Sequence, residues 1–154
     1  MTKSTKPAKA KASGYGEFLT NESLEKTGII IEYEAFRVTI ARAGGANKKY
    51  NKVSEAKTKP LRRAIQTETI SNERAEAVLR EVYVEAVILN WEVKNADGEW
   101  EQGIENMDRD VVPFDKKVVL AVLTGVPELW RDLKEQAEKV SLFRETLLED
   151  EGKN

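Results

Sequence analysis

The spacing of apolar residues changes at Gly44–Gly45, and this change limits the folds that the chain can adopt. Before the glycines, the run Phe36–Arg42 alternates apolar residues with polar or small ones, which is typical of a half-buried strand. A second β-rich run, Ile29–Tyr33, precedes it, so we predict a hairpin that turns near Glu34–Ala35. After the glycines the spacing becomes helical, and the rest of the chain is predicted to be mostly helix.

Two helical regions follow the glycines. Apolar residues over positions 50–65 predict two short helices or one bent helix, interrupted at Pro60, which suits the first turn of a new helix. A clearer helix is predicted to begin at Ser71 or Asn72, which are favourable N-cap residues, and to continue to Trp91. Its apolar stripe consists of Ala75, Val78, Leu79, Val82, Ala86 and Leu89.

The second half of the chain carries a turn signal and two more helices. Asn95–Gly98 contains Asp-Gly between short alternating runs, which indicates a small hairpin or an exposed loop. Asp115 is placed to cap a short apolar helix that ends at Gly125. Pro127 then begins the last predicted helix. The apolar stripe of that helix consists of Leu129, Leu133, Ala137, Val140, Phe143 and Leu147.

These patterns predict a mainly α protein with a small N-terminal β-hairpin, an α+β chain, in a single domain over residues 28–148. Residues 1–27 are predicted to be a disordered basic tail, because the first 13 residues are mostly Lys, Ala, Ser and Thr and cannot bury enough surface to offset their ordering entropy. Residues 149–154 form a short acidic tail. The composition, 40% hydrophobic and 34% charged, favours a folded and soluble chain.

Several classes of function are disfavoured by composition. The sequence has no histidine and no cysteine, which excludes Ser-His-Asp and Cys-His arrangements, disulfides and most zinc sites. No apolar run approaches the roughly 20 residues of a membrane-spanning helix, and the N-terminal lysines are not followed by the apolar region of a secretion signal. We therefore expect a cytoplasmic protein that is not an enzyme and needs no cofactor or metal.

Two stretches could be interpreted as catalytic or ligand-binding sites. In both we favour a structural interpretation without a ligand. Gly44–Lys49 lies between a strand and a helix, where backbone amides can hold a phosphate, but it lacks the P-loop and dinucleotide-binding patterns. A turn that uses glycine for positive φ explains it. Asp108 and Asp110, with Glu101 and Glu105 upstream, lack the spacing of a calcium loop and are expected to be surface acids.

Charge is distributed unevenly along the chain, with a basic segment followed by an acidic one. Residues 37–63 hold nine basic residues and one acid, Glu55, whereas residues 64–110 hold four basic and twelve acidic residues. Such a segment favours a solvated face or electrostatic docking of an acidic protein, with nucleic-acid binding as the alternative, because only Tyr50 is available among the cations to stack on a base. The candidate partner-binding cations are Arg37, Arg42, Lys48, Lys49, Lys52, Arg62 and Arg63.

The last predicted helix provides a second candidate surface. Leu133, Val140 and Leu147 repeat every seven residues, as in a seam that receives a partner helix. Packing onto the protein's own core is the alternative, and Gln136 on the seam favours it. Full burial of the five candidate residues contributes on the order of 10 kcal/mol before entropy, so something must cover them. The candidates are Leu129, Leu133, Val140, Phe143 and Leu147.

Two runs, Phe36–Tyr50 and Lys57–Ile65, resemble the front half of the tail assembly chaperones of long-tailed, siphovirus-type bacteriophages. The resemblance continues in later segments and covers about residues 28–148, although the family has no catalytic residues to compare. The later segments are Glu81–Tyr83, Trp91, Val126–Leu129 and Ser141–Arg144.

This resemblance implies a protein that coats the long helical tape measure protein, keeps it soluble and helps to recruit tail tube subunits. It also implies action in the host cytoplasm, absence from the mature virion, and a family in which a longer product often arises by ribosomal frameshifting. A homo-oligomer is compatible with such a role. Because the role depends on surfaces, the resemblance assigns no individual site residue.

Overall fold

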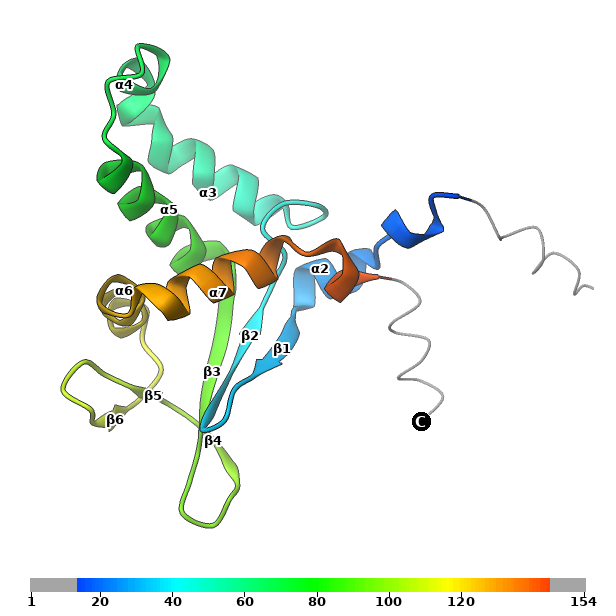
Figure 1. Ribbon diagram of the computed structural model, residues 1–154, viewed down its shortest axis with the longest axis vertical. Coiled ribbons are helices and arrows are strands. Elements are labelled where there is room, and N and C mark those ends of the chain that lie inside the picture. Colours follow the sequence, from blue (N-terminus) through cyan, green and yellow to red (C-terminus); the bar gives the residue numbers. More distant parts are fainter. Residues whose placement is uncertain (1–13, 145–154) are drawn as a thin grey trace, which may run out of the picture.

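The protein is an α+β structure with a sheet at its centre. The computed structural model describes residues 14–144 (Figure 1). The helices are the 3₁₀ turns η1 (Gly16–Phe18), η2 (Lys59–Leu61) and η3 (Val140–Phe143), and the α-helices α2 (Glu22–Thr27), α3 (Lys48–Thr58), α4 (Arg62–Gln66), α5 (Asn72–Ala86), α6 (Lys116–Gly125) and α7 (Pro127–Glu138). The strands are β1 (Ile29–Glu32), β2 (Phe36–Ile40), β3 (Ile88–Lys94), β4 (Trp100–Gln102), β5 (Ile104–Glu105) and β6 (Val111–Val112).

Four strands form an antiparallel sheet in the order β1-β2-β3-β4, and β5 pairs with β6 in a separate two-stranded sheet. The predicted N-terminal hairpin is confirmed: β1 and β2 pair around a tight turn, with Ile31 opposite Val38. Val38 faces Trp91 on the other side. The register between β2 and β3 shifts after Thr39, which leaves Leu89 without a partner in a bulge.

The prediction of a mainly α protein with one small hairpin is wrong, because a four-stranded sheet runs through the middle of the chain. The error lies at residues 87–91, which were assigned to the end of the long helix. That helix ends at Ala86, and β3 begins two residues later. A short apolar run fits a buried strand as well as a buried helix, and pairing with β2 decides between them here.

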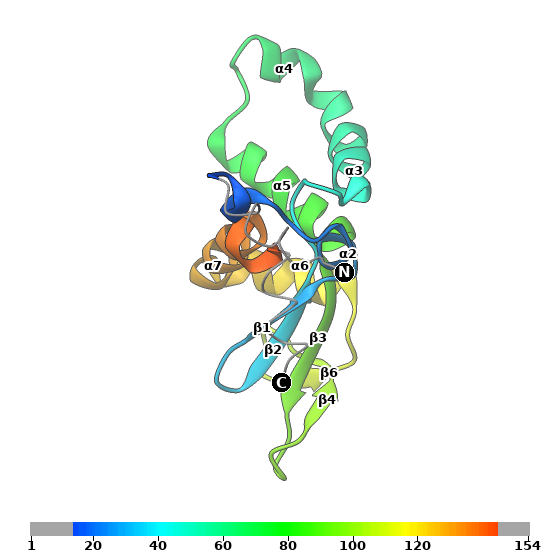
Figure 2. The same cartoon turned by 90° about the vertical axis from the view of Figure 1, so that its right-hand side faces the viewer.

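One face of the sheet carries the hydrophobic core. Val38, Ile40 and Trp91 belong to one buried cluster with residues of α5, α6 and α7. Leu123 of α6 and Leu133 of α7 are completely buried in that cluster. Both views place α6 and α7 beside the sheet, in the middle of the molecule (Figures 1 and 2). No helix in the described part of the chain has the length and hydropathy that spanning a membrane requires.

A helical arm projects from one end of the molecule. It consists of α3, η2, α4 and the first half of α5, and it is seen at the top of both views (Figures 1 and 2). The structure describes every residue of Lys48–Gln66, and none of them is fully buried. The second half of α5, by contrast, contributes Val82 and Tyr83 to the core. The hairpin between β3 and β4 extends at the opposite end (Figure 2).

Most predicted helix boundaries are confirmed. The Ser71 side chain accepts a hydrogen bond from Arg74 N, and Asp115 accepts from Lys117 N and Val118 N. Pro127 begins α7. The predicted continuation of this last helix is wrong within the described residues, because α7 ends at Glu138 and Lys139 is extended before η3.

The described chain also holds structure before Gly28. Residues 14–27 lie in the segment that was predicted to be a tail, and they form η1 and α2. Asn21 caps α2 by accepting from Leu24 N at 3.1 Å, and its own backbone N–H donates to Phe143 O at 2.7 Å. Both ends of the described chain therefore lie side by side. Residues 1–13 and 149–154 of the predicted tails lie outside the described residues.

Candidate binding groove

A groove of about 520 Å³ lies between the sheet, the β5–β6 hairpin and the α6–α7 corner. Most of the residues around it are apolar, and they come from segments that are far apart in the sequence. The apolar lining consists of Ala35, Phe36, Trp91, Val93, Met107, Val111, Val122, Val126 and Leu129. The polar lining consists of Lys94, Glu105, Asn106 and Arg109.

Aromatic rings form one wall of the groove. Phe36 stacks on Trp91 with ring centroids 5.5 Å apart, and Tyr33 stacks on the other side of Phe36 at 4.6 Å. The Tyr33 hydroxyl donates to Asp132 Oδ2 at 2.5 Å, which connects the sheet to α7. Burial, together with this hydrogen bond to Asp132, raises the pKa of Tyr33, so the hydroxyl remains a donor. The two rings that line the groove, Phe36 and Trp91, therefore present an uncharged surface to it.

The rim of the groove exposes large apolar side chains. Met107 is 49% exposed, Val111 61% and Val126 37%. The turn that carries Met107 is held by Asn106, whose Oδ1 accepts from Asp108 N and Asp110 N at 2.9 Å each. A flexible methionine at the edge of an apolar groove adapts to the shape of what it contacts.

The charged groups stay at the edge. Arg109 forms an ion pair with Glu105 on the same hairpin, and both are solvent-accessible. The hydrogen bond to Glu105 raises the pKa of Arg109, so its charge persists. Among the residues that the structure describes, no cluster of three His, Cys, Asp or Glu side chains is placed to hold a metal ion. The groove can therefore bury apolar groups of a ligand or partner.

The residues of the predicted apolar seam of the last helix do not lie on one surface. Leu133 and Phe143 are completely buried in the protein itself, so neither is available on this surface. Val140 is half-buried in η3. Leu129 lines the groove, and it is the member of the seam that the structure places there. Leu147 lies outside the described residues.

The cations of the predicted basic site also lie in different parts of the structure. Arg37 pairs with Glu92 at 2.7 Å and covers the Trp100 ring at 4.6 Å, on the sheet face away from the core. Arg42 forms an ion pair with the buried Glu25 and serves the fold. The remaining predicted cations are exposed on the helical arm, away from the groove. They are Lys48, Lys49, Lys52, Arg62 and Arg63.

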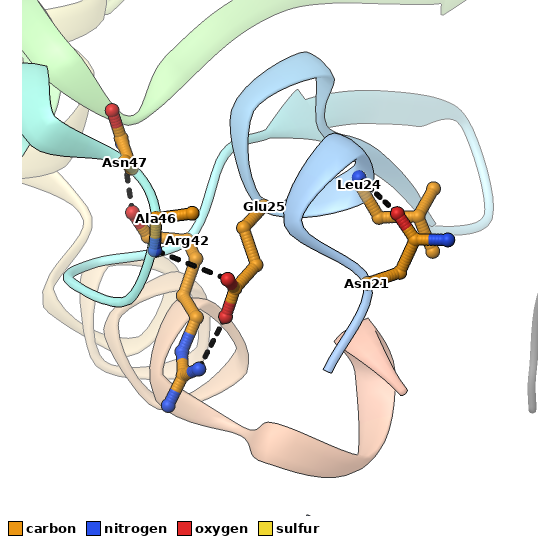
Figure 3. A network of polar contacts seen from close by, with 6 residues as sticks. All are labelled: Asn21, Leu24, Glu25, Arg42, Ala46 and Asn47. Carbon is orange, nitrogen blue, oxygen red and sulfur yellow. Dashed lines mark hydrogen bonds and ion pairs between the residues drawn. The ribbon is translucent and has the colours of Figure 1, made fainter. Parts of the chain in front are cut away.

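The ion pair of Glu25 explains the glycine-rich turn (Figure 3). The Glu25 carboxylate accepts a hydrogen bond from Ala46 N at 3.0 Å. This backbone amide belongs to the Gly44–Lys49 segment, whose amides could have held a phosphate. A Cβ on Gly45, where φ is +53°, would lie 2.8 Å from Glu25 Cδ, so glycine permits this approach. Asn47 Nδ2 donates to Arg42 O and Ala86 O at 2.8 and 2.9 Å. The turn thus binds an acid of its own chain and anchors the arm.

Sequence reasoning did not identify the groove. Its rim residues, Met107, Val111 and Val126, lie beside turns, and no periodicity distinguishes them. The only available signal was an apolar pair, Val111–Val112, next to a polar turn. Only the tertiary structure brings this hairpin against the α6–α7 corner.

The fold and the groove together define a small α+β protein with an open, largely apolar groove. A family model of the YdaY prophage proteins matches residues 45–154, more than two thirds of the chain. The chain therefore belongs to the YdaY prophage protein family, and it is a phage-related protein. The comparisons with curated proteins and with solved structures found no match.

Proposed function

We propose that this protein is a phage tail assembly chaperone that binds the tape measure protein, keeps it soluble and helps to recruit tail tube subunits. The observation that carries the proposal is the apolar groove with Met107, Val111 and Val126 exposed at its rim. Membership of a prophage family and the sequence resemblance to siphovirus chaperones support it. Such a protein acts in the host cytoplasm and leaves before the virion is complete.

The groove suits a client that exposes apolar helical seams. An amphipathic helix presents side chains at positions i, i+3, i+4 and i+7, which insert into an apolar groove. Burying three side chains such as those of the rim contributes on the order of 5 kcal/mol before entropic costs. One contact of this size is weak, so a client with many seams is held by multiple copies and released when tube subunits compete.

Co-expression with the tape measure protein of the same phage tests the proposal. We expect the wild type to increase the soluble fraction of the client and to co-purify with it. Met107→Asp and Val126→Asp place a charge in the groove and should abolish both effects. Ile30→Asp is the matched control, because Ile30 is 52% exposed and does not line the groove. Unchanged client solubility with the wild type, or equal loss with Ile30→Asp, would contradict the proposal.

The nucleic-acid alternative is supported by the exposed cations of the arm, but the aromatic residue among those cations does not face solvent. Tyr50, the aromatic residue among them, packs edge-on against Tyr83 with centroids 6.0 Å apart. Its burial, with the nearby charge of Glu138, raises the pKa of its hydroxyl, as expected for a ring directed inward. Phosphate contact alone predicts binding that is independent of sequence and weakens steeply with salt.

A further inference from the structure

The helical arm has two chemically different faces. Residues spaced along α3 towards α5 are partly buried, and they include Tyr50, Val53 and Lys57, which pairs with Glu81 at 3.5 Å. Five exposed cations lie along the same arm, two in α3, one in η2 and two in α4. We call this set the cationic face: Lys48, Lys52, Lys59, Arg62 and Arg63.

The cationic face has few charges of its own to balance it. Glu55 is the only acid between residues 48 and 66. Within residues 14–144, none of the five cations forms an ion pair, and three acids of α5 pair with other lysines: Glu76 with Lys134, Glu81 with Lys57 and Glu85 with Lys116. The arm therefore presents concentrated positive charge to solvent.

The opposite end of the molecule is acidic. Two hairpins contribute to it, β3–β4 and β5–β6, and we call five of their exposed acids the acidic end. They are Asp97, Glu99, Glu101, Asp108 and Asp110. The cation of the second hairpin, Arg109, is already paired with Glu105. In both views the β3–β4 hairpin lies at the far end from α4, so the two charged regions of one chain do not meet (Figures 1 and 2).

We propose that the cationic face of one copy docks on the acidic end of a second copy, head to tail. The two regions carry opposite charge, and the side chains of both are exposed to solvent. The net charge of the whole chain is only −2, so a nucleic acid attracted by the arm would be repelled by the acidic end. The interface is heterologous, so any chain of docked copies keeps one free cationic face and one free acidic end, and further copies can join.

This association does not depend on the groove or on a client. Because all ten side chains are exposed, the attraction is electrostatic and weak for each pair, and it falls with ionic strength as the Debye length shortens. We therefore expect short chains of copies that form at low salt and high protein concentration and dissociate at high salt.

A charge-swap experiment on the full chain tests the inference. Sedimentation velocity of the wild type at about 20 mM salt should show a mean sedimentation coefficient that rises with protein concentration, and about 500 mM salt should remove the rise. The arm variant, Lys52→Glu with Arg62→Glu and Arg63→Glu, should associate about tenfold more weakly. The end variant, Glu99→Lys with Glu101→Lys and Asp108→Lys, should behave in the same way.

An equimolar mixture of the two variants decides the matter, because it restores opposite charges across every contact. We expect the mixture to associate like the wild type while each variant alone does not. Circular dichroism melting checks that both variants fold, and the salt series on the wild type needs no variant at all. A wild type that stays monomeric at low salt, or a mixture that does not associate, would overturn the inference. So would DNA binding by the wild type that the arm variant abolishes, since the cationic face would then serve another ligand.

Discussion

Replacing Glu25 by alanine is the sharpest test of how the arm is attached to the sheet. Glu25 is 1% exposed, and its carboxylate forms an ion pair with Arg42 and accepts a hydrogen bond from Ala46 N. Those two partners lie in the turn that leads from β2 to α3. The substitution removes the acceptor for both donors, so it leaves the turn without the group that holds it.

The cost follows from these contacts. Breaking a buried ion pair by removing one partner costs about 3–5 kcal/mol, and a hydrogen bond to a charged group contributes about 1.5–3 kcal/mol. The Arg42 side chain is 19% exposed, so its guanidinium recovers some hydration in the variant. We therefore expect Glu25→Ala to lower the free energy of unfolding by about 2–4 kcal/mol.

The same carboxylate predicts a pH dependence. Burial raises the pKa of Glu25, but the hydrogen bonds from Arg42 and Ala46 outweigh it and hold the pKa below the ordinary value of 4.5. A carboxyl whose folded pKa is depressed stabilises the fold above its unfolded pKa, and that contribution is lost as pH falls through the folded value. The difference between wild type and Glu25→Gln should therefore be constant near neutral pH and shrink below about pH 4.5.

Urea unfolding followed by tryptophan fluorescence measures both effects, since Trp91 and Trp130 are buried. Glu22→Ala is the matched control, because Glu22 is an exposed acid of the same helix and its loss should change the free energy by about 0.5 kcal/mol or less. A cost for Glu25→Ala as small as that of the control would refute the reasoning, and so would a difference between wild type and Glu25→Gln that grows as pH falls.

Two further substitutions test the core and a helix start. Leu133→Ala should lower the free energy of unfolding by about 2–5 kcal/mol, because Leu133 is completely buried in the central cluster; a cost near zero in urea unfolding would show that the side chain is on the surface, as a partner seam requires. Ser71→Ala should cost about 1 kcal/mol by loss of the cap on Arg74 N, and a thermal melt that matches the wild type would count against it.

Local chemistry was enough to place most element boundaries. A capping side chain acts within three residues, so Ser71 and Asp115 could be recognised without knowledge of the fold, and the structure has both caps. Pro127 begins a helix for a similarly local reason, since its ring fixes φ and it lacks the N–H that a first helical position leaves unpaired. The N-terminal hairpin was predicted from the alternation in Phe36–Arg42 and the β-rich run before it, and the two strands pair as predicted.

Contacts between distant segments decided what the local patterns left open. The apolar run after Ala86 fits either a buried helix or a buried strand. It becomes strand β3 because it pairs with β2, which lies about 50 residues earlier in the chain. The same is true of Leu133 and Leu129, which share one helical stripe: the first is buried in the core and the second lines the groove.

The sequence by itself therefore determined the caps, turns and periodicities, together with the absence of histidine and cysteine chemistry and the uneven distribution of charge. Only the tertiary structure decided which apolar residues remain exposed at the groove, that Arg42 serves a buried acid, and that the cationic and acidic regions lie at opposite ends. The physical reason is the distance along the chain over which each interaction acts. Caps and turns depend on neighbours along the chain, whereas burial and ion pairing depend on which segments the fold brings together.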